Sequence, residues 1–386
     1  MRRWLPTHFL PIENEGESWY HGINRIAFDR IKSVREGAAV AKRKKNIWWR
    51  IKRFLLKLTC LVLSVILVAL IGVALYADRL LGLIGYQDPS LEDVYSPQDA
   101  ATMPEETETM PNDYDGSAYD DLQVSVADTI PQEVLDASEN VVNILLLGQD
   151  RREGEGRQRS DSMILCCFHK ETKKLTMVSF MRDLYVEIPG YWSTRMNAAY
   201  AWGGMPLLKE TILHNFGVRV DACIEVDFGG FEDIVDLMGG VDISLTEKEA
   251  AYFQKKGYKV TVGENHMDGR LALAYSRLRA IDSDFGRTQR QQTVLKAILA
   301  KVKGLSFGEM NTLMEKMMPM ITTDMTSGQM VSRLVECFPV ITAGEPASLR
   351  IPASGLYEDA YVNKQAVLVA DMDGNRQLLY DMLLGK

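Results

Sequence analysis

The feature that most constrains this chain is an uncharged apolar run at residues 58–77, LTCLVLSVILVALIGVALYA. A helix needs about 20 apolar residues to cross the hydrocarbon core of a bilayer. Only helices and closed barrels satisfy their backbone polar groups in that core, so a single span must be a helix. A helix buried in a soluble core is the alternative, but it does not suit so long an uncharged run beside a basic segment. We therefore predict one transmembrane helix.

The residues before this run fix its predicted orientation. Residues 42–57 contain eight Lys and Arg side chains, with Trp48 and Trp49 among them. The positive-inside rule then places the N-terminus in the cytoplasm and residues 78–386 outside the cell. A cleaved signal peptide fits less well, because the basic segment is long and residues 75–77 (LYA) are not a small-x-small cleavage site. We expect an uncleaved single-pass protein of the cell membrane.

Charge divides the rest of the chain, outside the predicted membrane helix, into three parts. Residues 1–57 contain 14 Lys and Arg against 5 Asp and Glu, whereas residues 80–139 contain 15 Asp and Glu and no Lys or Arg. High net charge with few apolar clusters predicts a mostly disordered stalk. The expected organisation is a basic cytoplasmic segment (1–57), a membrane helix (58–77), an acidic extracellular stalk (78–139) and a folded domain (140–386). The positive charge is not on the folded domain, which argues against nucleic-acid binding.

The folded domain has the pattern of an α/β protein. Short apolar runs alternate with amphipathic segments, which predicts a central mixed sheet flanked by helices. The expected strands are 141–147, 163–168, 175–180, 185–188, 223–228, 241–245 and 348–351. The expected helices are 205–216, 231–238, 271–275, 288–302, 307–319, 327–338 and 374–384.

Cysteine and histidine carry little functional signal. Four cysteines lie outside the predicted membrane helix, where a disulfide is permitted, but we expect them to be small buried hydrophobic residues. They are Cys166, Cys167, Cys223 and Cys337. The five histidines are scattered along the chain without metal-ligand spacing, so no zinc site is expected.

Charged residues gather where predicted strands and helices end. Asp150 directly follows a buried strand and Asp161 enters the next one; two carboxylates there can hold a hard cation. The carboxyl ends of strands border the ligand crevice in α/β sheets. Guanidinium groups bind phosphate with two hydrogen bonds and stay charged. Convergence of the arginines at element ends predicts a site for a di- or polyphosphate with Mg²⁺. These arginines are Arg182, Arg277, Arg279, Arg287 and Arg290, and Arg290 is a candidate substrate-binding residue. If residues 277–279 are extended, the guanidinium groups of Arg277 and Arg279 face the same way.

Six stretches of the chain resemble the LytR-CpsA-Psr family of envelope glycopolymer ligases. They are NILLLGQDRR (143–152), RSDSMIL (159–165), VSFMRDLYVEIPG (178–190), RMNAAYAWGG (195–204), FEDIVDLMGGVDI (231–243) and LALAYSRLRAIDSDFGRTQRQQ (271–292). They occur in the family's order and follow a span of the right orientation. Three positions depart from the family pattern: Met181 replaces a usual Pro, Gln158 a Gly and Arg195 a Lys.

The resemblance implies an α-β-α domain and a role for each matched residue. Asp150 and Asp161 would hold Mg²⁺, and Asp284 would be the general base. Pyrophosphate would be bound by Arg182, Arg277, Arg279 and Arg287, aided by Gln291 and Arg152. A polyprenyl tail would lie in an apolar tunnel lined by residues 141–147, 222–228 and 288–302.

The reaction implied by the resemblance is transfer of an anionic glycopolymer, teichoic-acid- or capsule-like, from a polyprenyl (undecaprenyl) pyrophosphate carrier to a peptidoglycan hydroxyl. A phosphodiester forms and polyprenyl phosphate is released. Two alternatives stay open: a Mg²⁺-dependent hydrolase of polyprenyl pyrophosphate, and a non-catalytic envelope regulator that binds the lipid carrier.

Overall fold

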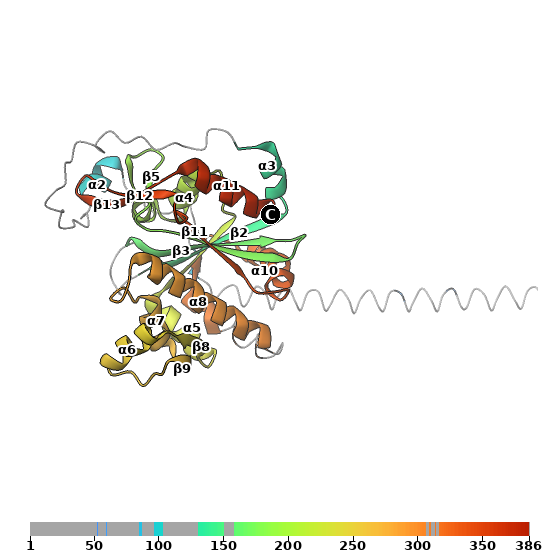
Figure 1. Ribbon diagram of the computed structural model, residues 1–386. Coiled ribbons are helices and arrows are strands. Elements are labelled where there is room, and N and C mark those ends of the chain that lie inside the picture. The colour runs from blue at the N-terminus through green and yellow to red at the C-terminus, as the bar shows by residue number, and fades with distance from the viewer. Residues whose placement is uncertain are drawn as a thin grey trace, which may run out of the picture. The chain divides into compact units, whose positions relative to one another are not determined.

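The computed structural model describes residues 85–86, 96–102, 130–149, 158–305 and 316–385, together with Lys52, Thr59, Glu309 and Leu313 (Figure 1). The chain divides into two compact units, Met1–Leu75 and Tyr76–Lys386. Apart from Thr59, the expected membrane helix lies outside the described residues. Within the described ranges, no helix has the length and apolar character needed to cross a membrane. The membrane anchor therefore stays a prediction.

The second unit is built around a seven-stranded mixed sheet, as the sequence predicts. Strand β2 lies in its middle, antiparallel to β3 and parallel to β7. Outward from these, β4 runs antiparallel to β3, β11 parallel to β4, and β10 antiparallel to β7. The order across the sheet is β1 (Gly85–Tyr86), β10 (Thr322–Thr323), β7 (Ala222–Asp227), β2 (Val141–Gln149), β3 (Ser160–His169), β4 (Lys174–Phe180) and β11 (Ala347–Ile351).

Helices cover both faces of this sheet (Figure 1). One face packs against α3 (Gln132–Ser138), α4 (Asn197–Phe216) and α11 (Met372–Leu383), with Leu145 and Leu165 among its buried side chains. The other packs against α8 (Asp284–Gly304) and α10 (Ser327–Ile341). Alternate residues of each strand point to opposite faces, so the near-continuous apolar run of β2 serves both cores.

A third core lies beside α8. It is formed by α5 (Phe228–Leu237), α6 (Glu247–Lys255), α7 (Gly269–Ser276) and the hairpin of β8 (Val241–Leu245) with β9 (Gly263–Met267). Two more hairpins pair β5 (Tyr185–Glu187) with β6 (Ser193–Arg195), and β12 (Tyr357–Val362) with β13 (Gln365–Ala370). Two more short helices are α2 (Pro97–Thr102) and the 3₁₀ turn η2 (Met318–Met320).

The structure corrects the predicted boundaries where apolar periodicity was weak. Helix α4 consists of two helical segments joined at a kink, where Gly203 and Gly204 have non-helical dihedral angles and Gly204 has a φ of 61°. The segment from Met205 to Phe216 was predicted, whereas the segment that begins at Asn197 was not. Most of the expected helix 307–319 lies outside the described residues. Helix α6 (EKEAAYFQK) and the β12–β13 hairpin were not predicted: α6 and β12 contain several charged residues, and β13 (QAVLVA) is a short apolar run that was missed.

Parts of the predicted stalk belong to the folded unit. Residues 132–138 form α3, whose Val134 is buried in the first core. Gly85 and Tyr86 form β1 and pair with β10, so these two residues of the predicted stalk belong to the sheet. The average charge of residues 78–139 conceals these short ordered segments.

Cys166, Cys167, Cys223 and Cys337 are buried, and they form no disulfide with one another in the structure. This confirms that they are small core residues. Burial raises the pKa of Cys166 to about 12, so its thiol stays protonated at neutral pH.

Candidate functional site

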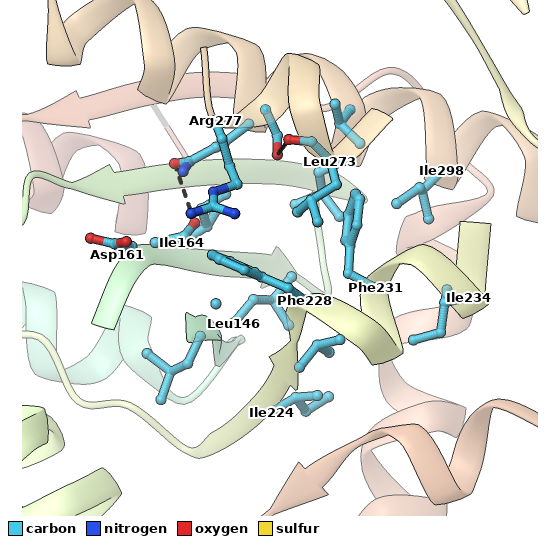
Figure 2. A pocket seen from close by; sticks show the side chains of 18 of the residues that line it. Leu146, Asp161, Ile164, Ile224, Phe228, Phe231, Ile234, Leu273, Arg277 and Ile298 are labelled. Atoms are coloured by element: carbon cyan, nitrogen blue, oxygen red, sulfur yellow. Dashed lines mark hydrogen bonds between the residues drawn. The ribbon is translucent and has the colours of Figure 1, made fainter. Parts of the chain in front are cut away.

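A cavity of about 640 Å³ lies between the sheet and helices α5, α7 and α8. Its inner part is apolar because each of these elements turns an apolar stripe toward it. In Figure 2, Leu146, Ile224, Phe231, Ile234 and Ile298 surround this part. Val226, Leu273, Val294, Leu295, Met317 and Ile321 also line the cavity. Such a space fits a hydrocarbon chain better than a polar metabolite.

One end of the cavity is strongly polar. Four arginines from three separate places in the sequence meet there, as the sequence predicts. Asp161 and Arg277 lie at this end in Figure 2. The polar lining residues are Asp161 and Ser162 at the start of β3, Arg182 after β4, Arg277 and Arg279 after α7, and Arg287 and Gln291 in α8.

Asp284 connects three of these arginines. Its Oδ2 lies 3.3 Å from Arg182 Nε and 3.0 Å from Arg287 Nη2, and its Oδ1 lies 3.2 Å from Arg279 Nε. Asp284 is the first residue of α8, and Arg287 follows one turn later on the same side. The guanidinium groups are thus held toward one carboxylate, in an arrangement that also suits a phosphate group.

Asp161 makes the second acidic contact in the cluster. Its Oδ1 lies 3.3 Å from Arg182 Nη1 and 3.8 Å from Arg279 Nη2. The side chain is about one third exposed at 32%, so a ligand or ion can reach it. The other predicted metal ligand, Asp150, follows β2 outside the described residues, as does Arg152.

Arg287 has donor atoms left over for a ligand. Its side chain is only 4% exposed. Among the described residues, no hydrogen-bond acceptor is available to Arg287 Nε and Nη1. Buried donors are costly to leave unpaired, so an anion at this end of the cavity would be stabilised by them. Gln291, one turn further, accepts a hydrogen bond from Ser162 Oγ at 3.3 Å.

Arg277 forms the wall of the cavity through an aromatic contact. Its Cζ lies 4.0 Å from the centroid of the Phe228 ring. The extended conformation considered for residues 277–279 does not occur at Arg277, which closes α7 with a helical φ of −96° and ψ of −3°. Both arginines still line the cavity, while Leu278 between them is buried in the third core, beside α8.

Arg290 does not reach the cavity, so its predicted role in substrate binding is wrong. Its guanidinium contacts Glu249 at 2.7 Å, the Leu278 carbonyl at 2.6 Å, and Asp282. Arg290 links α8 to α6 as a buried structural group.

Asp183 and Arg195 extend the cluster behind Arg182. Asp183 Oδ2 lies 3.3 Å from Arg182 Nε, and Asp183 Oδ1 lies 3.5 Å from Arg195 Nε. Burial raises the pKa of Asp183; Arg182 and Arg195 lower it, and Asp284 raises it further. No functional role was predicted for either residue, although Asp183 stands next to Arg182 in the sequence.

Known proteins share this sequence pattern and fold. The family model of the LytR_cpsA_psr family matches residues 106–379. The chain belongs to this family. The regulatory protein MsrR of Staphylococcus aureus (strain COL) is 32% identical to it over 258 residues, 63% of this chain and 74% of MsrR.

A second relative is named as an enzyme. The polyisoprenyl-teichoic acid–peptidoglycan teichoic acid transferase TagT of Bacillus subtilis (strain 168) is 38% identical over 179 residues. The matched residues are 44% of this chain and 56% of TagT, so the match spans little more than half of that enzyme.

Solved structures of TagT share the fold. TagT bound to LIIa-WTA superposes with a TM-score of 0.54 at 29% identity, over 65% of this chain and 92% of TagT. The LytR-CPS2A-psr family protein YwtF (TagT) with bound octaprenyl pyrophosphate lipid gives a TM-score of 0.50 at 27% identity, over 65% and 91%. These structures bear out the mixed sheet flanked by helices. The ligand bound to TagT is LIIa-WTA in the first structure and octaprenyl pyrophosphate lipid in the second.

Proposed function

We propose that this protein transfers an anionic glycopolymer from a polyprenyl pyrophosphate carrier to a hydroxyl group of peptidoglycan. The observation that carries the proposal is the joining of an arginine cluster to an apolar cavity of about 640 Å³. A lipid pyrophosphate has a doubly anionic head next to a hydrocarbon tail, and these two parts match the two ends of the cavity. The relatives named as teichoic acid transferases and the lipid-bound TagT structure support this reading.

In the proposed reaction, an acceptor hydroxyl attacks the phosphorus atom nearer the polymer. A new P–O bond forms to the acceptor, the P–O bond to the second phosphate breaks, and polyprenyl phosphate leaves with the electron pair. Arg182, Arg277, Arg279 and Arg287 stabilise the negative charge on the phosphoryl oxygens, which is where most of the catalytic effect should arise. No ATP is needed, because cleavage of the pyrophosphate bond supplies the driving force.

Asp284 is proposed to take the proton from the acceptor hydroxyl. Before substrate binds, its two oxygens contact three arginines at 3.0–3.3 Å. A bound pyrophosphate competes for the same guanidinium groups, which frees an Asp284 oxygen to accept a proton.

A magnesium ion fits the donor set near Asp161. Among the described residues there is no cluster of three or more metal-ligating side chains. Magnesium does not require one, because it commonly binds one or two carboxylates together with phosphate oxygens and water. Asp161, with Asp150, would hold the ion. When bound, it would neutralise charge on the phosphates.

The proposed setting is the outer side of the cell membrane, with the protein anchored by residues 58–77. A carrier lipid and the cell wall are both accessible there. The hydrophobic run and the eight preceding cations support this location.

Product analysis tests the proposed reaction. Purified full-length protein in detergent is incubated with a polyprenyl-pyrophosphate-linked polymer and peptidoglycan fragments, with and without Mg²⁺. We expect wall-linked polymer and polyprenyl monophosphate in equal amounts. Free polymer phosphate without wall linkage would instead indicate a hydrolase. Lipid binding without any turnover would indicate a carrier-binding regulator; the relative MsrR is named a regulatory protein.

A further inference from the structure

The first turn of α8 is packed against the C-terminal part of the chain. Phe285 directly follows Asp284, and its ring centroid lies 4.1 Å from Arg350 Cζ in β11. The Tyr357 ring of β12 lies 5.2 Å from the Phe285 ring, at an angle of 39°. A guanidinium held over an aromatic ring at this distance is attracted to it. Phe285 is thus fixed by groups from two strands.

Arg350 is itself held in place. Its Nε donates to the Pro352 carbonyl at 3.2 Å, and its Nη2 donates to Ser354 Oγ at 2.9 Å. Burial lowers the pKa of Arg350, with Tyr357 raising it, but an arginine remains charged. The side chain is therefore a fixed cation and not a mobile surface group.

Strand β11 also contacts the segment that carries Arg182. It pairs with β4 in parallel, and the Ile351 carbonyl accepts a hydrogen bond from Met181 N at 2.8 Å. The Leu349 carbonyl accepts a hydrogen bond from Gln292 of α8, also at 2.8 Å. One strand thus contacts both the loop that presents Arg182 and the helix that begins with Asp284.

We infer that Arg350 is a positioning residue for the transfer reaction, which holds the first turn of α8 so that Asp284 faces the arginine cluster. The inference rests on the proposed function. Arg350 does not line the cavity, so it contributes nothing directly to the binding of the lipid pyrophosphate. Its loss should leave ligand affinity intact while the Asp284 carboxylate shifts. A shift of about 1 Å in a reacting group can cost up to a hundredfold in rate.

The test compares the variants Arg350→Ala, Arg350→Lys, Phe285→Leu and the double variant Arg350→Ala with Phe285→Leu. Arg350→Lys can keep a cation over the ring, and it serves if the alanine variant unfolds. Arg219→Ala is the matched control, since the Arg219 side chain is 65% exposed and pairs with Asp221, which directly precedes β7. For each protein, kcat for transfer, the Kd of octaprenyl pyrophosphate and the thermal unfolding midpoint are measured.

We expect Arg350→Ala to lower kcat by about tenfold with Kd changed less than about twofold. Arg350→Lys should recover most of the rate, and the double variant should be no slower than the slower single variant. Unchanged kcat in a folded Arg350→Ala protein would overturn the inference, as would a parallel loss of affinity or additive rate losses. Absence of transfer by the unmodified protein would remove the proposed function itself, which is a different result.

Discussion

The arginines of α8 and of the segment after α7 have different sets of partners, and these partners decide what the loss of each side chain would do. Arg277 rests on the Phe228 ring and lines the cavity. Arg290 is buried against Glu249 and Asp282 and lies away from the cavity. Removal of the first should affect chemistry, whereas removal of the second should affect folding.

Arg277→Ala tests the catalytic role at the scale of one side chain. We expect transfer to fall by about a hundredfold to a thousandfold, because one fixed cation no longer stabilises the phosphoryl oxygens. The thermal unfolding midpoint should remain near that of the unmodified protein, as measured by circular dichroism. Arg219→Ala provides the control for loss of an arginine elsewhere. Transfer within about threefold of normal would contradict the assigned role.

The sequence predicted most of the polar residues that the structure brings together at the cavity, but not the neighbours that hold them. Arg182, Arg277, Arg279, Arg287, Gln291, Asp161 and Asp284 all gather at the cavity as expected. Arg290 was assigned wrongly, because spacing from Arg287 does not reveal which face of α8 is buried. The contact of Arg350 with Phe285 joins residues far apart in sequence, and no local pattern indicates it.

At the scale of elements, α8 holds the site together. Its first turns carry Asp284, Arg287 and Gln291, and its later turns line the apolar part of the cavity. The amphipathic pattern of residues 288–302 predicted this helix. The pattern could not predict the start at Asp284, because that turn is fixed by contacts with β4 and β11.

The link between α6 and α8 predicts a dependence of stability on pH. Burial raises the pKa of Glu249, but hydrogen bonds from Thr246 and Arg290 outweigh it and leave the pKa below its ordinary value of 4.5. The stability from Glu249 is therefore complete above this value and is lost as pH falls through the lower folded-state value.

Glu249→Gln should lower the free energy of unfolding by about 1–3 kcal/mol at neutral pH and flatten its decline in acid. Urea unfolding between about pH 3 and pH 7 measures both effects. A variant whose stability falls with acid as steeply as that of the unmodified protein would exclude this role for Glu249.

The apolar part of the cavity predicts selectivity for chain length. Ile298→Trp places a larger ring in this space while the arginine end is unchanged. We expect the affinity for octaprenyl pyrophosphate to fall by about tenfold or more, because the Trp ring would occupy space that the octaprenyl tail fills in the unmodified protein. A two-isoprene pyrophosphate should bind nearly as before, and calorimetry measures both affinities.

Leu213→Trp is the control for this change, because Leu213 is 41% exposed on α4 and does not line the cavity. Equal weakening of the long and short ligands by Ile298→Trp would indicate a general disturbance of the site, and would argue against a tail in this part of the cavity.

At the scale of the whole molecule, function depends on where the folded unit lies. The charge pattern predicts the cytoplasm for residues 1–57 and the outside for residues 78–386. A C-terminal reporter that works only outside the cytoplasm should be active, and replacement of the eight cations at residues 42–57 by Gln should reduce that activity. Activity of a cytosol-specific reporter at the same position would contradict the proposed topology.

The central claim is that the arginine cluster recognises a pyrophosphate joined to a lipid tail. The most direct measurement is the affinity of the full-length protein in detergent for octaprenyl pyrophosphate, compared with octaprenol of the same chain length. We expect the pyrophosphate to bind at least tenfold more tightly, and this difference to disappear in the double variant Arg279→Ala with Arg287→Ala. Equal affinities for the two lipids in the unmodified protein would contradict the account.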